Sequence, residues 1–580
     1  MKQLQRVNVP ADIKSMSMEE LKELAQDIRD VLITKVSETG GHMGPNLGMV
    51  EATIAMHYVF DSPKDKIVYD VSHQSYTHKI LTGRKEGFTN PEKYHSYSGY
   101  TNPDESEHDY FTVGHTATAI SLASGMAKAR DLRGEKSNVI AVIGDGALSG
   151  GEAYEGLNHV AEMNTNFIVL FNDNDMAIAP VSGGMYKNFK ALRDTKGKAS
   201  DNFFKAMGFN YLFVEDGHDI PSLIAAFEQV KDSDVPVVIH MVTVKGKGLA
   251  EAEANPEDFH YIMSKHFDVE AYNKQEHYEA IISDYLLAKM AADPSVVTLT
   301  AAVPAVAGFT PAKRAQAGKQ FVDVGIAEEH LIAMAAGLAK NGAKPVVVDD
   351  GTFLQRTYDQ LSQDLALNSN PATIVSFSIG GGISSMDATH SSAFDMAMMN
   401  GIPNLIVLSP ATKDELLAML DWSIEQTEYP VVIRVPAKVE SGNSGAAFDG
   451  HLDNQIVEKG SKVAILGLGA FFSLGRKVKE VLKAETGIDA TLINPRLSSE
   501  VDEQTLASLV ADHDVVVTFE DGVLDGGFGE KVARYFGPTA VKVINFGMKK
   551  EVNDRVPMKT LLERYHLTPE LAVADIKKLV

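Results

Sequence analysis

Two apolar runs decide the fold: Val139-Ile140-Ala141-Val142-Ile143, which leads into Gly144-Asp145-Gly146, and Phe167-Ile168-Val169-Leu170-Phe171, which leads into Asn172-Asp173-Asn174. Asp145 and Asn174 are 29 residues apart, about the length of one strand–helix–strand unit. Both side chains are therefore expected at the carboxyl edge of one parallel sheet, where open α/β folds bind ligands. Hard divalent cations prefer oxygen ligands, and glycine lets a diphosphate approach backbone N–H groups. Two tight turns are the alternative, but this spacing favours a cation and diphosphate site.

Composition and charge are those of a globular protein with several domains. The chain has 580 residues, of which 44% are hydrophobic and 23% charged, and its formal net charge is −24. This charge disfavours nucleic acid and anionic membranes as partners. There is no cysteine, which excludes disulfides, thiolate metal sites and cysteine nucleophiles. The N-terminus lacks an apolar signal core and no run approaches the roughly 18 apolar residues of a membrane span, so we expect a cytoplasmic protein.

Short β-rich runs alternate with helical patterns and predict parallel strand–helix–strand units. A Gly- and Ser-containing stretch at 440–447 is typical of a flexible linker. We therefore expect an α/β protein with three domains, at residues 1–290, 291–440 and 441–580, the last including the linker. The predicted strands of the first domain are 67–70, 139–143, 167–171 and 235–242. Those of the second are 295–299, 345–348, 373–377, 405–408 and 430–433, and those of the third are 462–467 and 514–519.

Four histidines of the first domain follow or precede glycines or strand ends, where side chains project into clefts: His42, His73, His115 and His260. Taken singly, each is more often a structural hydrogen-bonding residue. Several of them in the block that also binds a diphosphate suit proton transfer near neutral pH.

Longer motifs run through the chain in order: Gly41-His42, Asp70 to Arg84 (DVSHQSYTHKILTGR), Val113-Gly114-His115, Gly325 to His330 (GIAEEH) and Thr352 to Gln360 (TFLQRTYDQ). With these motifs the chain resembles the transketolase superfamily of thiamine-diphosphate enzymes, from about Leu21 to the C-terminus. Within it, the chain is most similar to the 1-deoxy-D-xylulose-5-phosphate synthase family. The resemblance implies two thiamine-diphosphate-binding doubly wound α/β domains and a smaller C-terminal α/β domain, in a homodimer.

The resemblance also implies roles for the cofactor residues. Glu328 matches the glutamate that bonds the pyrimidine nitrogen and so activates the cofactor. Phe353 matches the aromatic residue that packs on the pyrimidine ring. Asp145, Asn174 and the Met176 carbonyl match the ligands of a magnesium ion beside the diphosphate. The other implied cofactor-binding residues are His73, Gly114, His115, Gly144, Gly146 and Ala147.

Four further residues match positions that handle the substrate. His42 and His260 match histidines that contact the cofactor or move protons on the substrate, and the resemblance also implies a catalytic role for His390. Arg356 matches an arginine near the donor and acceptor, where a cation is the natural partner of a carboxylate or phosphate. Without the resemblance, Glu328 would be explained as a favourable charge at a helix start, and Phe353 as a core residue.

The chain departs from the synthase pattern around the acceptor. The two arginines that would bind the acceptor phosphate fall on Ile379 and Ala437. An expected aspartate falls on Met386, with Asp387 one residue later, and an expected tyrosine falls on Asp350. The stretch 185–209 is also shorter than in the synthases. We therefore expect an intact cofactor site with an altered substrate pocket, in which Lys438 partly compensates at most.

We expect an enzyme that uses thiamine diphosphate and Mg²⁺ to join a two-carbon unit, from pyruvate or a ketose, to an aldehyde. A transketolase-like enzyme with another sugar substrate is the first alternative. A component of a 2-oxo-acid decarboxylase or dehydrogenase is less favoured, because the sequence has neither a partner-docking segment nor a split chain. A silent paralogue is disfavoured because Glu328 and the metal ligands are present.

Overall fold

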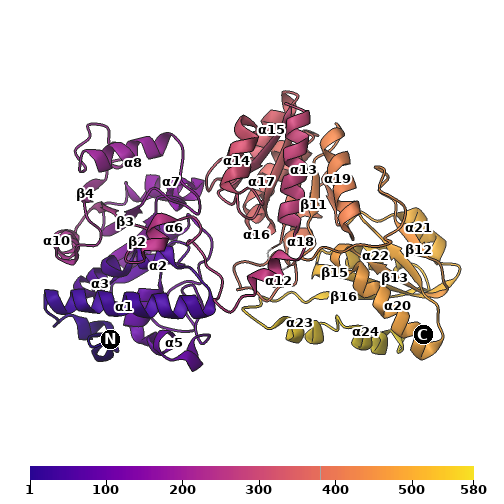
Figure 1. Cartoon of the computed structure of the whole chain (residues 1–580), viewed down its shortest axis with the longest axis horizontal. Coiled ribbons are helices and arrows are strands. Elements are labelled where there is room, and N and C mark those ends of the chain that lie inside the picture. The colour runs from indigo at the N-terminus through magenta and orange to yellow at the C-terminus, as the bar shows by residue number, and fades with distance from the viewer. Residues whose placement is uncertain (379–380) are drawn as a thin grey trace. The chain divides into compact units, whose positions relative to one another are not determined.

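The computed structural model describes residues 1–378 and 381–580 and divides into two compact units. Unit 1 comprises Met1–Tyr272 with Gly325–Ala327, and unit 2 comprises Asn273–Val324 with Glu328–Val580. The division falls within α12 (Val269–Asn273). Figure 1 shows unit 1 in indigo to magenta and unit 2 in magenta to yellow. Among the described residues, no helix is long and apolar enough to cross a membrane.

Unit 1 is built on one parallel sheet of five strands in the order β1-β2-β3-β5-β4. Its strands are β1 (Lys66–Tyr69), β2 (Val139–Gly144), β3 (Phe167–Asp173), β4 (Asn210–Val214) and β5 (Pro236–Val242). Its helices are α1 (Met18–Thr39), α2 (Gly44–Leu47), α3 (Val50–Val59), α4 (Tyr76–Lys79), α5 (Glu86–Thr89), α6 (Ala119–Leu132), α7 (Gly151–Val160), α8 (Gly184–Asp194), α9 (Phe203–Ala206), α10 (Ile220–Val230) and α11 (Ala250–Ala254).

Helices cover both faces of this sheet, because side chains alternate along each strand. Ile140 and Val142 of β2 pack with α1, α3 and α10 on one face. Val139, Ala141 and Ile143 pack with α6, α7 and α8 on the other. The sheet is therefore doubly wound, and the carboxyl ends of β1, β2, β3 and β5 meet at one edge.

Unit 2 contains two sheets. The first is parallel, in the order β10-β11-β9-β8-β6-β7, with strands β6 (Val296–Thr300), β7 (Phe321–Asp323), β8 (Lys344–Asp350), β9 (Thr373–Phe377), β10 (Ile406–Leu408) and β11 (Val431–Arg434). The second has the order β12-β14-β13-β15-β16, with strands β12 (Gln455–Glu458), β13 (Lys462–Gly467), β14 (Thr491–Asn494), β15 (His513–Val523) and β16 (Lys542–Met548). Only β12 of this second sheet pairs antiparallel.

The helices of unit 2 flank these sheets. They are α13 (Tyr278–Ala292), α14 (Pro311–Ala317), α15 (Glu328–Lys340), α16 (Gly351–Leu354), α17 (Tyr358–Gln360), α18 (Asp395–Met399), α19 (Lys413–Glu425), α20 (Phe472–Thr486), α21 (Glu503–Leu509), α22 (Phe528–Phe536), α23 (Met558–Arg564) and α24 (Pro569–Ile576).

The stretch predicted to be a flexible linker is held by hydrogen bonds. Residues 440–447 have no helix or strand, as expected. However, Asn494 Nδ2 donates to the Ser444 carbonyl at 3.0 Å, and the buried Arg496 guanidinium donates to the Ala446 carbonyl. The prediction of flexibility is therefore wrong for 444–446, because β14 and the turn after it supply partners that the local composition does not reveal.

Candidate active site

The predicted cation site lies at the carboxyl edge of the first sheet. Asp145 follows β2 directly, and its buried carboxylate accepts three backbone N–H groups, from Gly146 at 2.9 Å, Asn174 at 3.2 Å and Met176 at 3.1 Å. The carboxylate thus joins the ends of β2 and β3. Gly146 permits this approach, because a Cβ there would lie 2.8 Å from the Ala177 Cβ.

The donor set fits a hard cation. Burial, together with the neighbouring Asp173 carboxylate, raises the pKa of Asp145 to about 7. The Asn174 Oδ1 is buried and has no hydrogen-bond partner among the described residues. A buried carboxylate and an orphaned amide oxygen at neighbouring strand ends are what a divalent cation would satisfy. The described residues hold no cluster of three or more His, Cys, Asp or Glu side chains suited to a metal, so cofactor oxygens would complete such a shell. The Met176 carbonyl stays a predicted ligand.

The loops expected to bind the diphosphate are anchored to neighbouring strands. Asp70, which follows β1, accepts the N–H groups of Ala117 and Ala119 at 2.9 and 3.0 Å. These bonds hold the loop that carries Gly114 and His115 at the start of α6. Gly144 ends β2, and Ala147 begins a short turn before α7.

Lys245 is a residue of this edge that the sequence motifs did not identify. It follows β5 and is 5% exposed, and its Nζ donates to the Ala177 carbonyl at 2.7 Å. Burial lowers the pKa of Lys245 to about 8, against the opposing effect of Asp145. The sequence signal that could have identified Lys245 is its position between a strand end and the glycines at 246 and 248.

Three of the predicted histidines form one cluster. The ring centroids of His42 lie 5.0 Å from His73 and 5.4 Å from His260, and His73 and His260 are 5.4 Å apart. Burial and the nearby Lys245 hold the pKa of His260 well below its usual value. The His260 imidazole is therefore neutral near pH 7 and able to accept a proton only at a cost.

Residues missed by the sequence analysis build this cluster. Asn46 Nδ2 donates to the carbonyls of both His42 and His73, at 2.8 and 2.7 Å, and its Oδ1 accepts the Tyr76 N–H at 2.9 Å. The rings of Tyr261 and Tyr100 lie edge-on to His42, with centroids at 5.1 and 5.9 Å. No periodicity in the sequence marks these long-range contacts.

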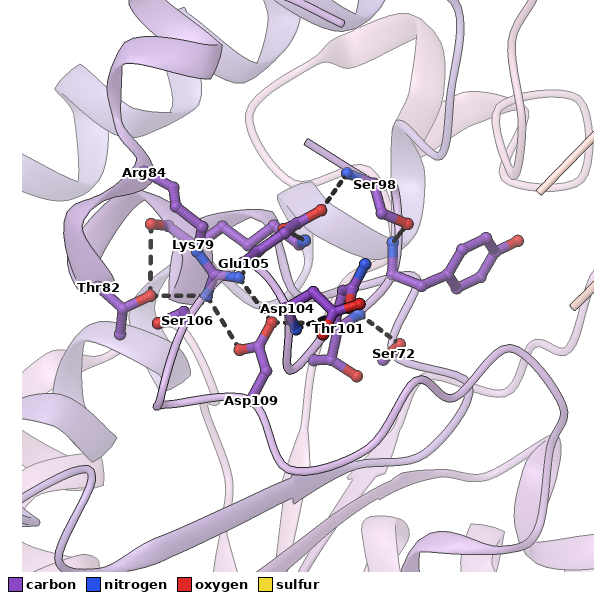
Figure 2. Close-up of polar contacts among 12 residues, drawn as sticks. Ser72, Lys79, Thr82, Arg84, Ser98, Thr101, Asp104, Glu105, Ser106 and Asp109 are labelled. Atoms are coloured by element: carbon purple, nitrogen blue, oxygen red, sulfur yellow. Dashed lines mark hydrogen bonds and ion pairs between the residues drawn. The ribbon is translucent and has the colours of Figure 1, made fainter. Parts of the chain in front are cut away.

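A buried ionic cluster supports the segment that carries Tyr100. Figure 2 shows Arg84 and Lys79 between the carboxylates of Glu105 and Asp109. Arg84 donates two bonds to Asp109, at 2.6 and 2.9 Å, and Asp109 also accepts the Asn102 N–H at 2.8 Å. Glu105 accepts the Ser98 N–H at 2.6 Å. The cluster thus fixes residues 98–109 to the helical segment that begins with α4.

The predicted activating glutamate lies in unit 2. Glu328 is the first residue of α15 and is 4% exposed. Burial raises the pKa of Glu328, and the Arg356 guanidinium, 3.6 Å from Oε2, opposes this rise. The structure thus brings together two of the predicted catalytic residues.

Phe353 and His390 form the second predicted pair in this unit. Their ring centroids are 5.9 Å apart, and Thr352 Oγ1 donates to the Thr389 carbonyl at 3.1 Å. His390 Nδ1 lies 3.2 Å from Asp387, whose carboxylate also accepts the Thr389 N–H at 2.9 Å. Although burial opposes it, these hydrogen bonds hold the pKa of Asp387 well below its usual range.

The described residues around the expected acceptor site explain why no obvious phosphate-binding cation is found among them. Ala437 and Lys438 are exposed, and Ile379 lies outside the described residues. The buried Arg434 is engaged by Asp395, at 2.9 Å, and by the Asp521 carbonyl, at 3.0 Å. Asp521 in turn accepts the N–H groups of Gly382 and Ile383, so its role is structural.

Comparisons with known proteins match three successive parts of the chain. Residues 4–200 and 191–243 match the family described as 1-deoxy-D-xylulose-5-phosphate synthase, 275–439 the transketolase pyrimidine binding domain, and 453–571 the transketolase C-terminal domain. The chain is 38% identical to the 1-deoxy-D-xylulose-5-phosphate synthase of Dictyoglomus turgidum, over 99% of this chain and 98% of the relative. It is 39% identical to that of Dictyoglomus thermophilum, over 90% of each. The chain belongs to the 1-deoxy-D-xylulose-5-phosphate synthase family.

Membership in this synthase family makes the chain a transferase of the transketolase type that depends on thiamine diphosphate. The predicted fold class, with two doubly wound domains and a smaller third, is confirmed. The synthase model matches in two segments that overlap at 191–200, within the stretch predicted to be short. The roles of the individual site residues stay predictions.

Proposed function

We propose that this chain is a thiamine-diphosphate- and Mg²⁺-dependent synthase that joins a two-carbon unit from pyruvate to an aldehyde. Two observations carry this proposal, one in each unit. Unit 1 holds an anionic oxygen donor set at Asp145 and Asn174, and unit 2 holds a buried carboxylate at Glu328. When bound, the cofactor supplies a nucleophilic carbon for carbon–carbon bond formation.

Each residue of the two sites would have one role, which its surroundings support. Asp145, Asn174 and the Met176 carbonyl would hold Mg²⁺. Glu328 would place its carboxylate at the pyrimidine nitrogen and share a proton with it there. The clustered histidines 42, 73 and 260 would transfer protons on the substrate, and Arg356 would pair with its carboxylate. A ketose donor, as in transketolases, is the alternative to pyruvate.

Product identification tests this function. The purified protein is incubated with thiamine diphosphate, Mg²⁺, ¹³C-labelled pyruvate and a panel of aldehydes, and products are identified by mass spectrometry. We expect a labelled ketose that is absent without the cofactor and strongly reduced in Glu328→Gln. If no labelled product forms from pyruvate, and a ketose forms when an unlabelled ketose donor replaces it, the transketolase-like alternative is supported instead.

We further propose that the acceptor is not glyceraldehyde 3-phosphate, the aldehyde whose condensation with pyruvate yields the product that the relatives are named for. A phosphate dianion gains about 1.5–3 kcal/mol from each charge-assisted hydrogen bond. Ala437 supplies none, Lys438 is exposed, and Arg434 is already paired with Asp395. We expect kcat/KM for glyceraldehyde 3-phosphate to be lower than that of the true acceptor by about two powers of ten.

A matched pair of acceptors tests this pocket. Steady-state kinetics with pyruvate compare D-glyceraldehyde with its 3-phosphate, in the wild type and in Ala437→Arg. The added arginine should raise kcat/KM for the phosphorylated acceptor about tenfold or more, with little effect on the other. Efficient wild-type turnover of glyceraldehyde 3-phosphate would contradict the altered pocket, and the chain would then use the ordinary synthase acceptor.

A further inference from the structure

The β8 strand ends in two consecutive buried acids, and only one of them has an evident structural task. Asp349 and Asp350 are 1% and 2% exposed. The Asp350 carboxylate caps α16, because it accepts the Thr352 N–H at 3.0 Å, and it also accepts the Ser392 hydroxyl at 3.3 Å. Asp349 Oδ1 accepts the Asp350 N–H at 2.8 Å, but its Oδ2 has no hydrogen-bond partner among the described residues.

Glu328 also buries a carboxylate oxygen that lacks a hydrogen-bond partner among the described residues. It begins α15, which packs against β8. Its Oε2 is buried and also has no hydrogen-bond partner in the described part of the chain, since Arg356 at 3.6 Å lies beyond hydrogen-bond distance. Two carboxyl groups on adjoining elements therefore each bury an oxygen that lacks a partner, which proteins rarely tolerate.

Electrostatics decide which of the two groups is neutral. Two unpaired carboxylates buried together are costly, so one of them takes up a proton. The charged groups that face Glu328 are Arg356, Glu329 and Asp349, whereas Asp349 faces Glu328 and Asp350 and no cation. Burial, followed by the Glu328 charge, holds the pKa of Asp349 well above its usual value. A neutral Asp349 carries an O–H donor that needs an acceptor.

We propose that Asp349 is a neutral acid that donates a hydrogen bond to the Glu328 carboxylate, and so positions Glu328 and keeps it ionised. This inference rests on the proposed role of Glu328 in activating the cofactor. Asp349 acts through Glu328 and is a positioning residue, not a catalytic one.

Infrared spectroscopy of the cofactor-free protein tests the bond directly. A protonated carboxylic acid has a carbonyl-stretch band separate from that of carboxylates. We expect Asp349→Asn to remove one such band at neutral pH, and Glu328→Gln to shift that band to higher frequency, because the acid loses its charged acceptor. Asp293→Asn, which removes a carboxylate 3.0 Å from Lys344 at the other end of β8, should leave the band unchanged. A wild-type protein without this band would overturn the proposal.

The pH dependence of C2 proton exchange in bound thiamine diphosphate supplies a functional readout. Removing the donor in Asp349→Leu should raise the pKa of Glu328 and move the profile to higher pH by about one to two units. Asp349→Asn keeps a neutral donor and should preserve the profile. A shift to lower pH in both variants would mean that Asp349 is charged, and no shift in Asp349→Leu would mean that it does not contact Glu328; either result overturns the proposal.

The infrared measurement separates this inference from the function. If the wild type fails to accelerate exchange, the proposed function fails, while the infrared bands of Asp349→Asn and Glu328→Gln still report on the bond. If exchange is fast but the band does not respond to Glu328→Gln, the function stands and the Asp349 bond does not.

Discussion

Asp145 illustrates how one residue can serve both the fold and the site. The sequence predicts a loop carboxylate whose loss would spare the fold. In the structure the same carboxylate accepts three backbone N–H groups that would otherwise lack partners. Each buried group left unsatisfied costs about 1–3 kcal/mol, so Asp145→Ala would lower stability as well as cofactor affinity.

Asp145→Asn is the more informative variant. An amide oxygen can still accept backbone hydrogen bonds but carries no charge for a cation. We expect the melting temperature to fall less than in Asp145→Ala, while the affinity for Mg²⁺ and thiamine diphosphate falls by at least about 10–100-fold. Isothermal titration calorimetry with both ligands checks this. An Asp145→Asn protein with wild-type affinity would remove Asp145 from the proposed metal shell.

Single site residues can be predicted from the sequence where a local motif reveals their chemistry. Asp145, Asn174 and Glu328 follow strand ends or begin a helix, so their neighbours in the chain reveal them. Asn46 and Asp349 could not be found in this way. Two partners of Asn46 belong to the segment 73–76, and Asp349 lies on a strand that packs against the helix of Glu328, so only the folded chain brings these together.

Asn46 joins the chain segments that carry the histidine cluster. Its side chain makes three hydrogen bonds, to the segments that carry His42, His73 and Tyr76. Asn46→Asp is nearly isosteric but cannot donate to both carbonyls, so we expect a lower melting temperature and a loss of turnover. Asn188→Asp is the control and should change both little, because this half-buried asparagine donates from Nδ2 to one carbonyl at 2.8 Å and accepts one N–H at Oδ1, outside the histidine cluster. Unchanged turnover in Asn46→Asp would show that the histidine segments are held otherwise.

The ionic cluster of Figure 2 should make unit 1 sensitive to acid. Although burial opposes it, hydrogen bonds from His78 and Arg84 hold the pKa of Asp109 far below its usual value. A depressed carboxyl pKa stabilises the fold at all pH above the unfolded value of about 3.9, and this contribution is lost as pH falls further. Asp109→Asn should lose up to about 3–5 kcal/mol at pH 7, because the buried Arg84 keeps only the longer ion pair with Glu105, and should show a shallower acid limb.

Urea unfolding at a series of pH values measures this prediction. Glu135→Gln removes a carboxylate from the exposed ion pair with Arg133 and should leave the unfolding free energy nearly unchanged. If Asp109→Asn behaves like Glu135→Gln, the buried cluster does not hold residues 98–109.

The internal strands other than β14 were predictable, and so were two of the edge strands, β1 and β10, whereas the remaining edge strands were not. β2, β3, β8 and β9 are buried on both faces and appear as continuous apolar runs, as parallel strands do. β4, β7 and β12 lie at sheet edges and are largely half-buried, so they lack such runs and the sequence analysis missed them. The predicted domain limits at 290 and 440 stay a prediction.

We propose that the whole molecule is a homodimer. This proposal rests on the likeness to transketolases, whose domains pair at the cofactor. Sedimentation equilibrium with cofactor and Mg²⁺ should give twice the chain mass of 62.8 kDa. A species of 62.8 kDa that turns over substrate would contradict the dimer and leave the assignment of the reaction intact.

The most direct test of the central claim is the rate at which the protein exchanges the C2 proton of bound thiamine diphosphate. If the proposed roles are right, exchange requires both Asp145 and Asn174 of unit 1 and Glu328 of unit 2. The reaction is run in deuterated buffer with Mg²⁺, quenched with acid and followed by proton NMR. We predict that the wild type accelerates exchange over the free cofactor and that Glu328→Gln is slower by about 10²–10⁴-fold. A wild type no faster than free cofactor, or a Glu328→Gln variant as fast as the wild type, would contradict the account.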